Sequence, residues 1–428
     1  MIFLYRLLTT FFYPIFIILI YYRKLIKKED SVRYKEKIFS SNFNVSRKHN
    51  SKLIWFHAAS IGELKSIVPI INNLNQNNKS LEFLVTTITL SSSNLAKEIF
   101  KNQKNIHHRF FPLDILFLLN KFIMRWKPDI VIIVETEIWP NLIHVVKKSK
   151  IPLAIINTRI TKKTFKRWFF FPKTAKKIFG AFDLCLAANE ETKDYLKTLN
   201  AKNIYCLGNI KFINETKLIY ETVNEDFLSN NLIWCAVSTH ETEEELCLKA
   251  HCKLKEQYSE IKTIIAPRHI NRVKSIKKLC ATFNLQSQIL GKNEKIHQSK
   301  EVIIINSFGR INEFLKFARS AFIGKSTIKK LEDVGGQNPI DAAKLGCNIY
   351  HGPYIYNFKE IYDFLEKNKV SKLILNPDEL SDNLLKDFKN SKEKSFNFLK
   401  IMNDLEKKTL SQTMNVINKF LINEIKKT

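Results

Sequence analysis

The residue best suited to acid–base chemistry in this chain is Glu63, which ends the motif HAASIGE (57–63). An apolar run, Leu53–Phe56, precedes the motif and an apolar-periodic segment, Leu64–Leu74, follows it, which predicts a strand, a tight turn and a helix. Ligands of open α/β sheets gather beyond the carboxyl ends of the strands, so a glutamate there is a candidate general base. Ser60 and Glu63 also have the spacing of a capping box, and spacing alone favours that role.

A second acidic motif, ETEIWPN (135–141), follows a predicted strand that ends at Val134. If this strand and the strand before Glu63 share one parallel sheet, Glu135 and Glu137 point toward the same cleft. Buried acids need a cationic or hydrogen-bonding partner. Alternatively, Glu137 only sits in a first helical turn, where it favours the helix dipole. Lys211, in GNIKF (208–212), could neutralise a leaving phosphate, although taken alone it is most simply a surface lysine.

The second half of the chain carries groups suited to binding anions. Arg268 follows a predicted strand in APRH (266–269) and could hold a phosphate or a carboxylate through two hydrogen bonds. In GGQNPID (335–341), Asn338 is the expected N-cap and Pro339 the first helical residue, so free N–H groups there would form an anion site. A further Ser-x-x-Glu box is expected at 238–241. The chain contains neither a Gly-x-Gly-x-x-Gly nor a Walker loop, which disfavours NAD or ATP binding through those loops.

Strand-like and helix-like segments alternate along the chain and position these residues. This rhythm predicts parallel sheets with right-handed crossovers. A polar stretch at 214–231 interrupts it, so we expect two doubly wound α/β domains that face a cleft. The predicted strands are 53–56, 83–87, 130–134, 153–156, 184–186 and 204–207 before the polar stretch, and 233–237, 263–266, 302–305, 321–323, 348–350 and 373–375 after it.

Charge and cysteine content limit the class of partner and compartment. The net charge of +28 indicates an anionic partner such as nucleic acid, acidic lipid or a phosphorylated substrate, although the basic residues are spread evenly and part of the excess is compositional. The hydrophobic fraction of 45% is that of a folded protein. Seven cysteines without a C-x-x-C pair fit a reducing compartment and no metal site.

The amino terminus, residues 1–28, is predicted to be a membrane anchor. Leu7–Tyr22 is nearly all apolar and aromatic, Arg6 precedes it, and four cations lie within 23–28. Sixteen residues fall short of the roughly 20 needed to span a bilayer, so both a spanning and an interfacial arrangement remain open. No small-x-small cleavage site follows, and the cationic flank favours a cytoplasmic location for the rest of the chain.

Eight motifs in order resemble the Kdo transferase family, which transfers 3-deoxy-D-manno-octulosonic acid (Kdo) in lipid A assembly. The resemblance spans nearly the whole chain and implies a GT-B fold, a CMP-Kdo donor, a lipid A precursor acceptor (lipid IVA), and inverting transfer without metal or cofactor. The motifs are HAASIGE (57–63), ETEIWPNLI (135–143), NTRIT (157–161), GNIKF (208–212), STHETEEE (238–245), APRH (266–269), GGQNPIDAAKLG (335–346) and GPYIYNF (352–358).

The resemblance also implies roles for individual residues. Glu63 would deprotonate the acceptor hydroxyl, and Glu135 and Lys211 would stabilise the transition state. An acceptor-binding domain would cover 29–213, and a CMP-sugar-binding domain with the C-terminal helices would cover 214–428. The positions that match CMP-contacting residues are Pro267, Arg268, Phe308, Gly309, Arg310, Asn338, Pro339, Ile340 and Asp341.

Several donor-half positions depart from the family pattern. The family usually has Met-Gly-Glu where this chain has residues 308–310, His where it has Gln337, and Glu where it has Asp341. The loop from Ser326 to Gln337 is also about four residues longer here. From the motifs as a whole we expect a Kdo transferase on the cytoplasmic face of the inner membrane, in contact with anionic lipid and without nucleic acid. The alternatives are another lipid-acting GT-B transferase with a different nucleotide-sugar donor, or a basic nucleic-acid-binding protein.

Overall fold

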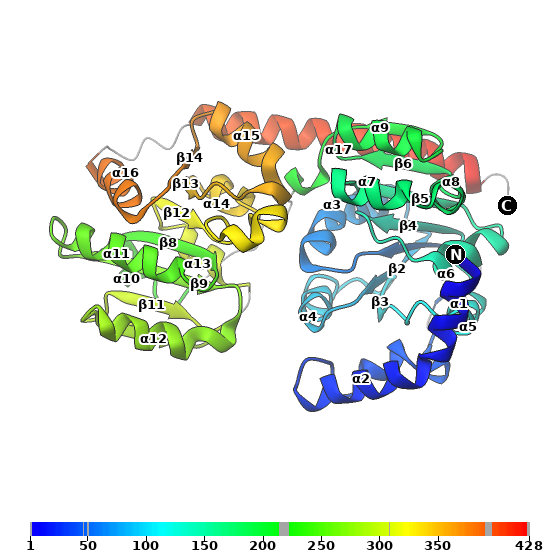
Figure 1. Cartoon of the computed structure of the whole chain (residues 1–428), viewed down its shortest axis with the longest axis horizontal. Coiled ribbons are helices and arrows are strands. Elements are labelled where there is room, and N and C mark those ends of the chain that lie inside the picture. The colour runs from blue at the N-terminus through cyan, green and yellow to red at the C-terminus, as the bar shows by residue number, and fades with distance from the viewer. Residues whose placement is uncertain are drawn as a thin grey trace. The chain divides into compact units, whose positions relative to one another are not determined.

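A computed structural model describes residues 2–45, 47–48, 51–213, 222–307, 309–389 and 396–425 (Figure 1). The chain forms two compact units. Unit 1 comprises Met1–Thr216 together with Leu405–Thr428, and unit 2 comprises Lys217–Asp404. Each unit is a parallel sheet with helices on both faces, so the predicted pair of doubly wound α/β domains is confirmed.

The sheet of unit 1 has seven parallel strands in the order β3-β2-β1-β4-β5-β6-β7. Its order reverses direction between β1 and β4, and this switch point is where doubly wound sheets bind ligands. The central strands are almost continuous apolar runs because both faces are covered. The strands are β1 (Lys52–His57), β2 (Leu81–Thr87), β3 (Ile106–Phe110), β4 (Ile130–Val134), β5 (Leu153–Thr158), β6 (Leu184–Ala187) and β7 (Ile204–Cys206).

Two hydrophobic clusters cover the two faces of this sheet. One cluster contains residues of α5 (Leu116–Trp126), α6 (Pro140–Lys148), α8 (Pro172–Phe179) and α9 (Glu190–Thr198), with α7 (Lys162–Phe169) packed against it. The other contains residues of α3 (Ile61–Asn77), α4 (Leu90–Ile99) and α17 (Phe396–Ile425).

The last helix corrects the predicted domain boundary. The sequence placed all of 214–428 in the second domain, whereas α17 begins in unit 2 and continues into unit 1 from Leu405 onward. Its apolar side chains explain this, since Met414, Ile417, Phe420 and Leu421 pack among the residues of α3 and of strands β1 and β2.

The sheet of unit 2 repeats the arrangement in the order β10-β11-β9-β8-β12-β13-β14, with its switch point between β8 and β12. Its strands are β8 (Leu232–Thr239), β9 (Ile261–Pro267), β10 (Ser287–Leu290), β11 (Val302–Ile305), β12 (Ser320–Ile323), β13 (Asn348–His351) and β14 (Ser371–Leu373). Its helices are α10 (Glu225–Ser229), α11 (Glu243–Lys255), α12 (Val273–Thr282), α13 (Ile311–Leu315), α14 (Ile340–Lys344), α15 (Lys359–Lys367) and α16 (Pro377–Lys389).

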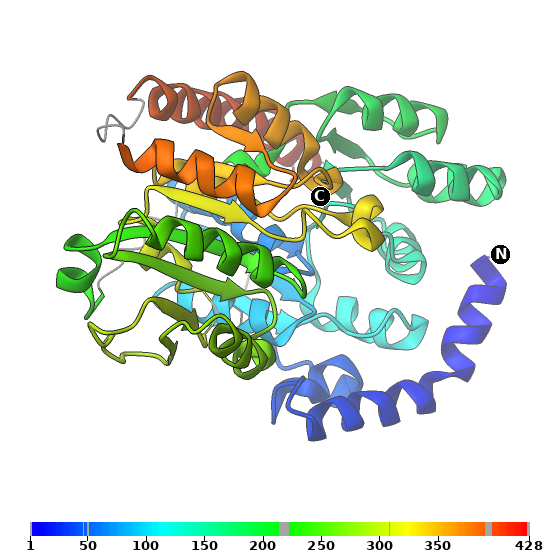
Figure 2. The same cartoon turned by 60° about the vertical axis from the view of Figure 1, so that its left-hand side comes forward.

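Two helices form the amino terminus, α1 (Ile2–Phe11) and α2 (Tyr13–Leu25). They meet at a bend of 57°, visible in Figure 2, and only the bent pair taken together has the length and apolar composition of a membrane span, since no single described helix has them. Ile2, Tyr13 and Phe16 pack against unit 1, and the Tyr5 hydroxyl donates to Asp114 at 2.8 Å.

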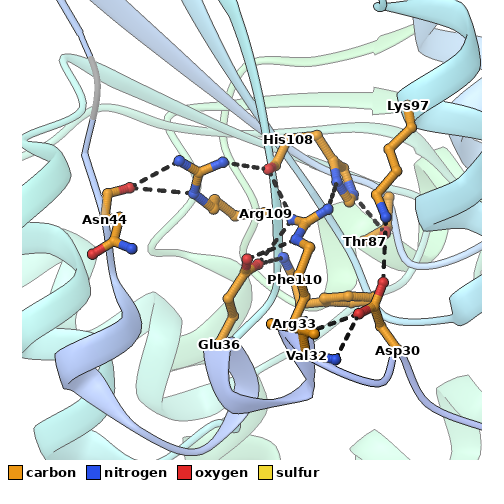
Figure 3. A network of polar contacts seen from close by, with 10 residues as sticks. All are labelled: Asp30, Val32, Arg33, Glu36, Asn44, Thr87, Lys97, His108, Arg109 and Phe110. Atoms are coloured by element: carbon orange, nitrogen blue, oxygen red, sulfur yellow. Dashed lines mark hydrogen bonds and ion pairs between the residues drawn. The ribbon is translucent and has the colours of Figure 1, made fainter.

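The segment after α2 is fastened to unit 1 by a network of polar contacts (Figure 3). Arg33, in the 3-10 helix Arg33–Lys37, donates to Glu36 at 2.7 and 2.9 Å and to the backbone oxygen of His108 in β3 at 3.0 Å. Glu36 also accepts the Phe110 N–H at 2.9 Å, and Lys97 of α4 contacts Asp30 at 3.3 Å. The chain that leads from α2 into the sheet is therefore held firmly against β3.

Candidate active site

Glu63 lies in the first turn of α3, directly after β1, and its side chain is buried. Ser60 is the N-cap: its hydroxyl accepts the Glu63 N–H at 3.3 Å and donates to Glu63 Oε1 at 2.7 Å. The Ala59 N–H donates to Oε2 at 2.7 Å. The helix cap expected from the spacing is therefore present, and it holds the carboxylate at the carboxyl end of the sheet.

Glu135 directly follows β4, the neighbour of β1, so the two acids flank the switch point of unit 1. Its backbone is left-handed, with φ 60°, and its N–H donates to the Ile156 oxygen at 2.8 Å. A non-glycine residue in this conformation is strained and persists when its surroundings impose it, often at functional sites. The Glu135 carboxylate forms an ion pair with Lys211.

Lys211 is held by the turn that carries it. It lies in the 3-10 helix Ile210–Phe212, where the Asn209 side chain accepts the Lys211 N–H at 2.9 Å. Asn157, at the end of β5, accepts the Ile210 N–H at 3.0 Å and ties this turn to the sheet. The Lys211 side chain is only 19% exposed, so it is a paired site residue and not the plain surface lysine that its type alone suggested.

The acids of this edge shift one another's ionisation. Burial, followed by the charge of Glu135, raises the pKa of Glu63 to about 7 despite the opposing hydrogen bond from Ser60. Burial also raises the pKa of Glu137, whose carboxylate accepts the Trp139 indole N–H at 2.9 Å. A general base works best when its pKa lies near the working pH. Glu63 has this property, and unit 1 brings it within electrostatic reach of the Glu135–Lys211 pair.

His57, the first residue of the motif, is an uncharged, buried residue that packs in the core at the end of β1. It is fully buried, burial lowers its pKa to about 3, and its Nδ1 lies 2.9 Å from the Thr86 hydroxyl. The ring packs on Phe111 at a centroid distance of 4.1 Å. The sequence placed His57 in the motif but offered no sign of its partner Thr86, which comes from the next strand.

In unit 2, Arg268 follows β9, and its N–H donates to the Thr239 oxygen at the end of β8 at 3.0 Å. Pro267, also predicted as a donor contact, is buried and ends β9 beside Thr239. The Arg268 guanidinium is exposed at this edge, where its charge, after burial, lowers the pKa of His269. Both residues thus lie at the carboxyl end of the sheet, next to its switch point.

The Ser-x-x-Glu box predicted at 238–241 is not formed. The helix α11 begins at Glu243 after the N-cap Thr242, and Glu241 is exposed. Glu243 instead accepts the His240 N–H at 2.9 Å and, across the switch point, the N–H groups of Lys325 at 2.7 Å and Ser326 at 2.9 Å. Because STHETEEE contains four glutamates, the sequence alone does not show which of them is buried at the switch point.

The structure describes two of the three residues predicted at 308–310 to contact CMP. Phe308 lies outside the described residues, and Gly309 has a left-handed backbone with φ 81°. The Arg310 guanidinium donates to Glu313 through Nε and to the Gly291 oxygen at 2.8 Å. Arg310 is thus paired with Glu313 within unit 2, and its contact with CMP stays a prediction.

The predicted helix start at Asn338 is shifted by one residue. The helix α14 begins at Ile340 with Pro339 at the N-cap position, and it is only five residues long. Asn338 is exposed, and its side chain accepts the Ile340 N–H at 3.1 Å. That bond occupies one of the amides expected to bind an anion, and so short a helix has a weak dipole. Asp341 lies in the first turn of α14.

The two glycines before Asn338 are explained by close backbone packing. A Cβ on Gly335 would lie 2.3 Å from the Tyr354 oxygen, and Gly336 has φ 82°. The Gly336 N–H donates to the Lys325 oxygen, which joins this loop to the end of β12. Over the ranges that the structure describes, no group of three or more His, Cys, Asp or Glu residues is arranged to hold a metal ion.

Solved structures share this architecture. A putative UDP-N-acetylglucosamine 2-epimerase from Listeria monocytogenes matches 88% of this chain and 98% of its own, with a TM-score of 0.59 and 15% identity. A glycosyltransferase from Rickettsia africae matches 89% of this chain and 100% of its own, with a TM-score of 0.53 and 11% identity. Two Rossmann-like units of this kind in one chain form the GT-B fold, which both of these structures share.

Sequence relatives identify the family. The family model for 3-deoxy-D-manno-octulosonic-acid transferase (kdotransferase) matches residues 33–214. A 3-deoxy-D-manno-octulosonic acid transferase of Rickettsia bellii is 30% identical over 97% of this chain and 99% of its own length. One from Haemophilus influenzae is 29% identical over 73% of each. The chain belongs to the Kdo transferase family and is a glycosyltransferase.

Proposed function

We propose that this protein transfers Kdo from CMP-Kdo to a hydroxyl group of the lipid A precursor, lipid IVA, with inversion at the anomeric carbon and without a metal ion. The observation that carries the proposal is the buried Glu63 carboxylate, whose pKa is raised to about 7 beside the Glu135–Lys211 ion pair. Such a group takes a proton readily near neutral pH, which is what the activation of an alcohol requires.

In this reaction Glu63 removes the proton from the acceptor hydroxyl, and the hydroxyl oxygen attacks the anomeric carbon of the Kdo unit. The bond between that carbon and the phosphate oxygen breaks, and CMP leaves with the bonding electron pair. Lys211 and Arg268 supply positive charge, the former beside the reacting acids and the latter toward the leaving phosphate. Glu135 holds the Lys211 ammonium in place through their ion pair.

The test is CMP release from CMP-Kdo with and without lipid IVA, together with the mass of the lipid product. Replacement Glu63→Gln keeps the size of the side chain but removes the base, so acceptor-dependent release should fall by roughly 10²–10⁴-fold. The matched control is Ser60→Ala, which removes the cap, costs about 1 kcal/mol of stability and keeps the carboxylate. A wild-type protein without acceptor-dependent turnover contradicts the proposal. A Glu63→Gln variant that loses only stability restricts Glu63 to capping.

We further propose that the protein lies on the cytoplasmic face of the inner membrane, with α1 and α2 in the interface and not across the bilayer. The supporting observation is how α1 is tied down: Tyr5 donates to the buried Asp114, and Asn141 donates to the Thr9 hydroxyl at 3.3 Å. A helix that crossed the membrane would have to give up these bonds. The outward apolar side chains of the pair are Phe3, Leu4, Leu7, Leu8, Phe11, Phe12, Ile15, Ile18, Leu19, Tyr22 and Leu25.

A second exposed apolar element supports the same orientation. Phe169, Phe170 and Phe171 join α7 to α8 and are exposed, and both helices pack on the hydrophobic cluster that α1 and α2 also cover. Cations accompany these elements: Arg6 of α1 and Lys177 of α8 both lower the pKa of His144, after the effect of its burial. Aromatic side chains with basic neighbours suit an anionic lipid surface.

Sedimentation with vesicles of phosphatidylethanolamine and phosphatidylglycerol tests this orientation. The triple variant Phe169→Ser, Phe170→Ser, Phe171→Ser should bind more weakly than wild type, and salt should weaken both. The control is Leu375→Ser, an equally exposed apolar residue in unit 2. Equal binding by all three proteins would contradict a role for the Phe169–Phe171 segment.

A further inference from the structure

Lys325 occupies the switch point of unit 2, a place for which the motif analysis named no residue. It follows β12 by two residues, and β12 is the neighbour of β8 across the point where the strand order reverses. Its backbone is left-handed with φ 58°, a conformation that is uncommon for residues other than glycine. In unit 1 the first residue after the corresponding strand β4 is Glu135, which is also left-handed.

The surroundings that impose this conformation are hydrogen bonds from both sides. The buried Glu243 carboxylate accepts the N–H groups of Lys325, Ser326 and Thr327 at 2.7, 2.9 and 3.1 Å. The Lys325 oxygen accepts the Gly336 N–H at 2.6 Å. These bonds fix the backbone of the turn in the absence of ligand. Binding of a ligand by Lys325 therefore loses little backbone entropy.

The Lys325 ammonium lies within electrostatic reach of the Arg268 guanidinium. The Lys325 side chain is half-buried, and within the described part of unit 2 it has no hydrogen bond or ion pair. Burial, followed by the charge of Arg268, lowers the pKa of the Lys325 ammonium. Burial also lowers the pKa of His240, with a smaller contribution from the charge of Lys325. The Glu243 carboxylate accepts five hydrogen bonds from donors of the two loops and, among the described residues, forms no ion pair with the Lys325 ammonium.

We propose that Lys325 is a further donor-binding residue, which together with Arg268 holds an anionic group of the donor, either its phosphate or the carboxylate of its sugar. The proposal rests on the proposed function. Two cations within electrostatic reach of each other, one of them on a preformed turn, form a site for an anion at the ligand-binding edge of a doubly wound sheet. Arg310, by comparison, is paired with Glu313 and donates to the Gly291 oxygen.

Equilibrium binding of three probes tests this assignment: cytidine, CMP and CMP-Kdo. The variant Lys325→Met keeps the length of the side chain and removes its charge, and Lys330→Met, on an exposed lysine of the same loop, is the control. Lys325→Met should weaken the binding of CMP about tenfold if the ammonium meets the phosphate, or of CMP-Kdo alone if it meets the sugar carboxylate, and should leave cytidine unchanged. Lys325→Arg should restore most of the loss.

The outcomes separate this inference from the proposed function. If the wild-type protein binds neither CMP nor CMP-Kdo, the proposed function fails. If the wild-type protein binds them and Lys325→Met binds them equally well, the role of Lys325 is overturned and the proposed function stands. Equal weakening of cytidine, CMP and CMP-Kdo would also overturn the role, because it would reveal a disturbed loop and not a lost charge.

Discussion

The raised pKa of Glu63 predicts that the free energy of unfolding falls as the pH rises, and that the substitution Glu63→Gln removes this dependence. Burial and the neighbouring acids raise this pKa from 4.5 to about 7. One pKa unit corresponds to about 1.4 kcal/mol, so ionising the buried carboxyl costs roughly 3 kcal/mol more than ionising it in the unfolded chain. Between pH 4.5 and pH 7 the native state keeps a proton that the unfolded chain has released, so this contribution to stability is lost as the pH rises.

The variant Glu63→Gln has no proton to lose and should escape this penalty. Urea unfolding of both proteins at pH 4 and pH 8, followed by tryptophan fluorescence, measures the difference. The free energy of unfolding of the variant, relative to wild type, should rise by about 3 kcal/mol between these pH values. In parallel, kcat/KM of the wild-type protein should rise with pH around a midpoint near 7. A stability difference that stays constant with pH would refute the argument that Glu63 is poised as a base.

Three further perturbations test the surrounding structure. Replacing Glu135 by Gln removes a charge that raises the pKa of Glu63, so the midpoint of the pH–rate profile should move to lower pH; an unmoved midpoint would separate the two acids electrostatically. Gly324→Ala should destabilise unit 2 by about 1–3 kcal/mol in thermal unfolding, because its Cβ would lie 2.7 Å from Glu243 Oε2 and from the Ser238 oxygen. Asp114→Ala should free α1 and leave two amides of α6 unsatisfied, at a cost of about 1–3 kcal/mol. Limited proteolysis should then cut the amino terminus of that variant faster, and unchanged cleavage would contradict the anchoring role of Asp114.

The strands missed by the sequence analysis are outermost in their sheets. The pattern analysis found the central strands because their apolar runs are continuous, but it omitted β3 and β10. The strand β3 reads Ile-His-His-Arg-Phe, since an edge strand meets polar groups such as Arg33 and Thr87 in place of a second core. The edge strand β14 begins and ends two residues before the predicted 373–375. The other two edge strands, β7 and β14, were predicted, so the loss of apolar patterning in β3 and β10 comes from their polar side chains and not from the edge position alone.

For the candidate site, the sequence predicted which residues lie at one edge of the sheet but not their detailed contacts. Glu63, Glu135 and Lys211 stand at the carboxyl ends of predicted strands, so their meeting at one edge followed from the parallel sheet. Neither the left-handed backbone of Glu135 nor its ion pair with Lys211 has a signature in sequence. The strand alternation does not place Lys325 beside Arg268 either, because that proximity depends on the order of β9, β8 and β12 and on the inward turn of Glu243.

Glu63 and Glu243 occupy similar positions in the two units but differ in the hydrogen bonds and charges around their carboxylates. Each opens the helix that follows the first strand of its unit, and each is buried beside a switch point. Glu243 accepts hydrogen bonds from five donors of the two flanking loops, so its carboxylate is fixed and fixes the loops. Glu63 accepts two, from Ala59 and Ser60, and faces the charges of Glu135 and Glu137. With fewer hydrogen-bond donors and two acids nearby, Glu63 takes up a proton more readily than Glu243, and this difference supports the proposal that the base lies in unit 1.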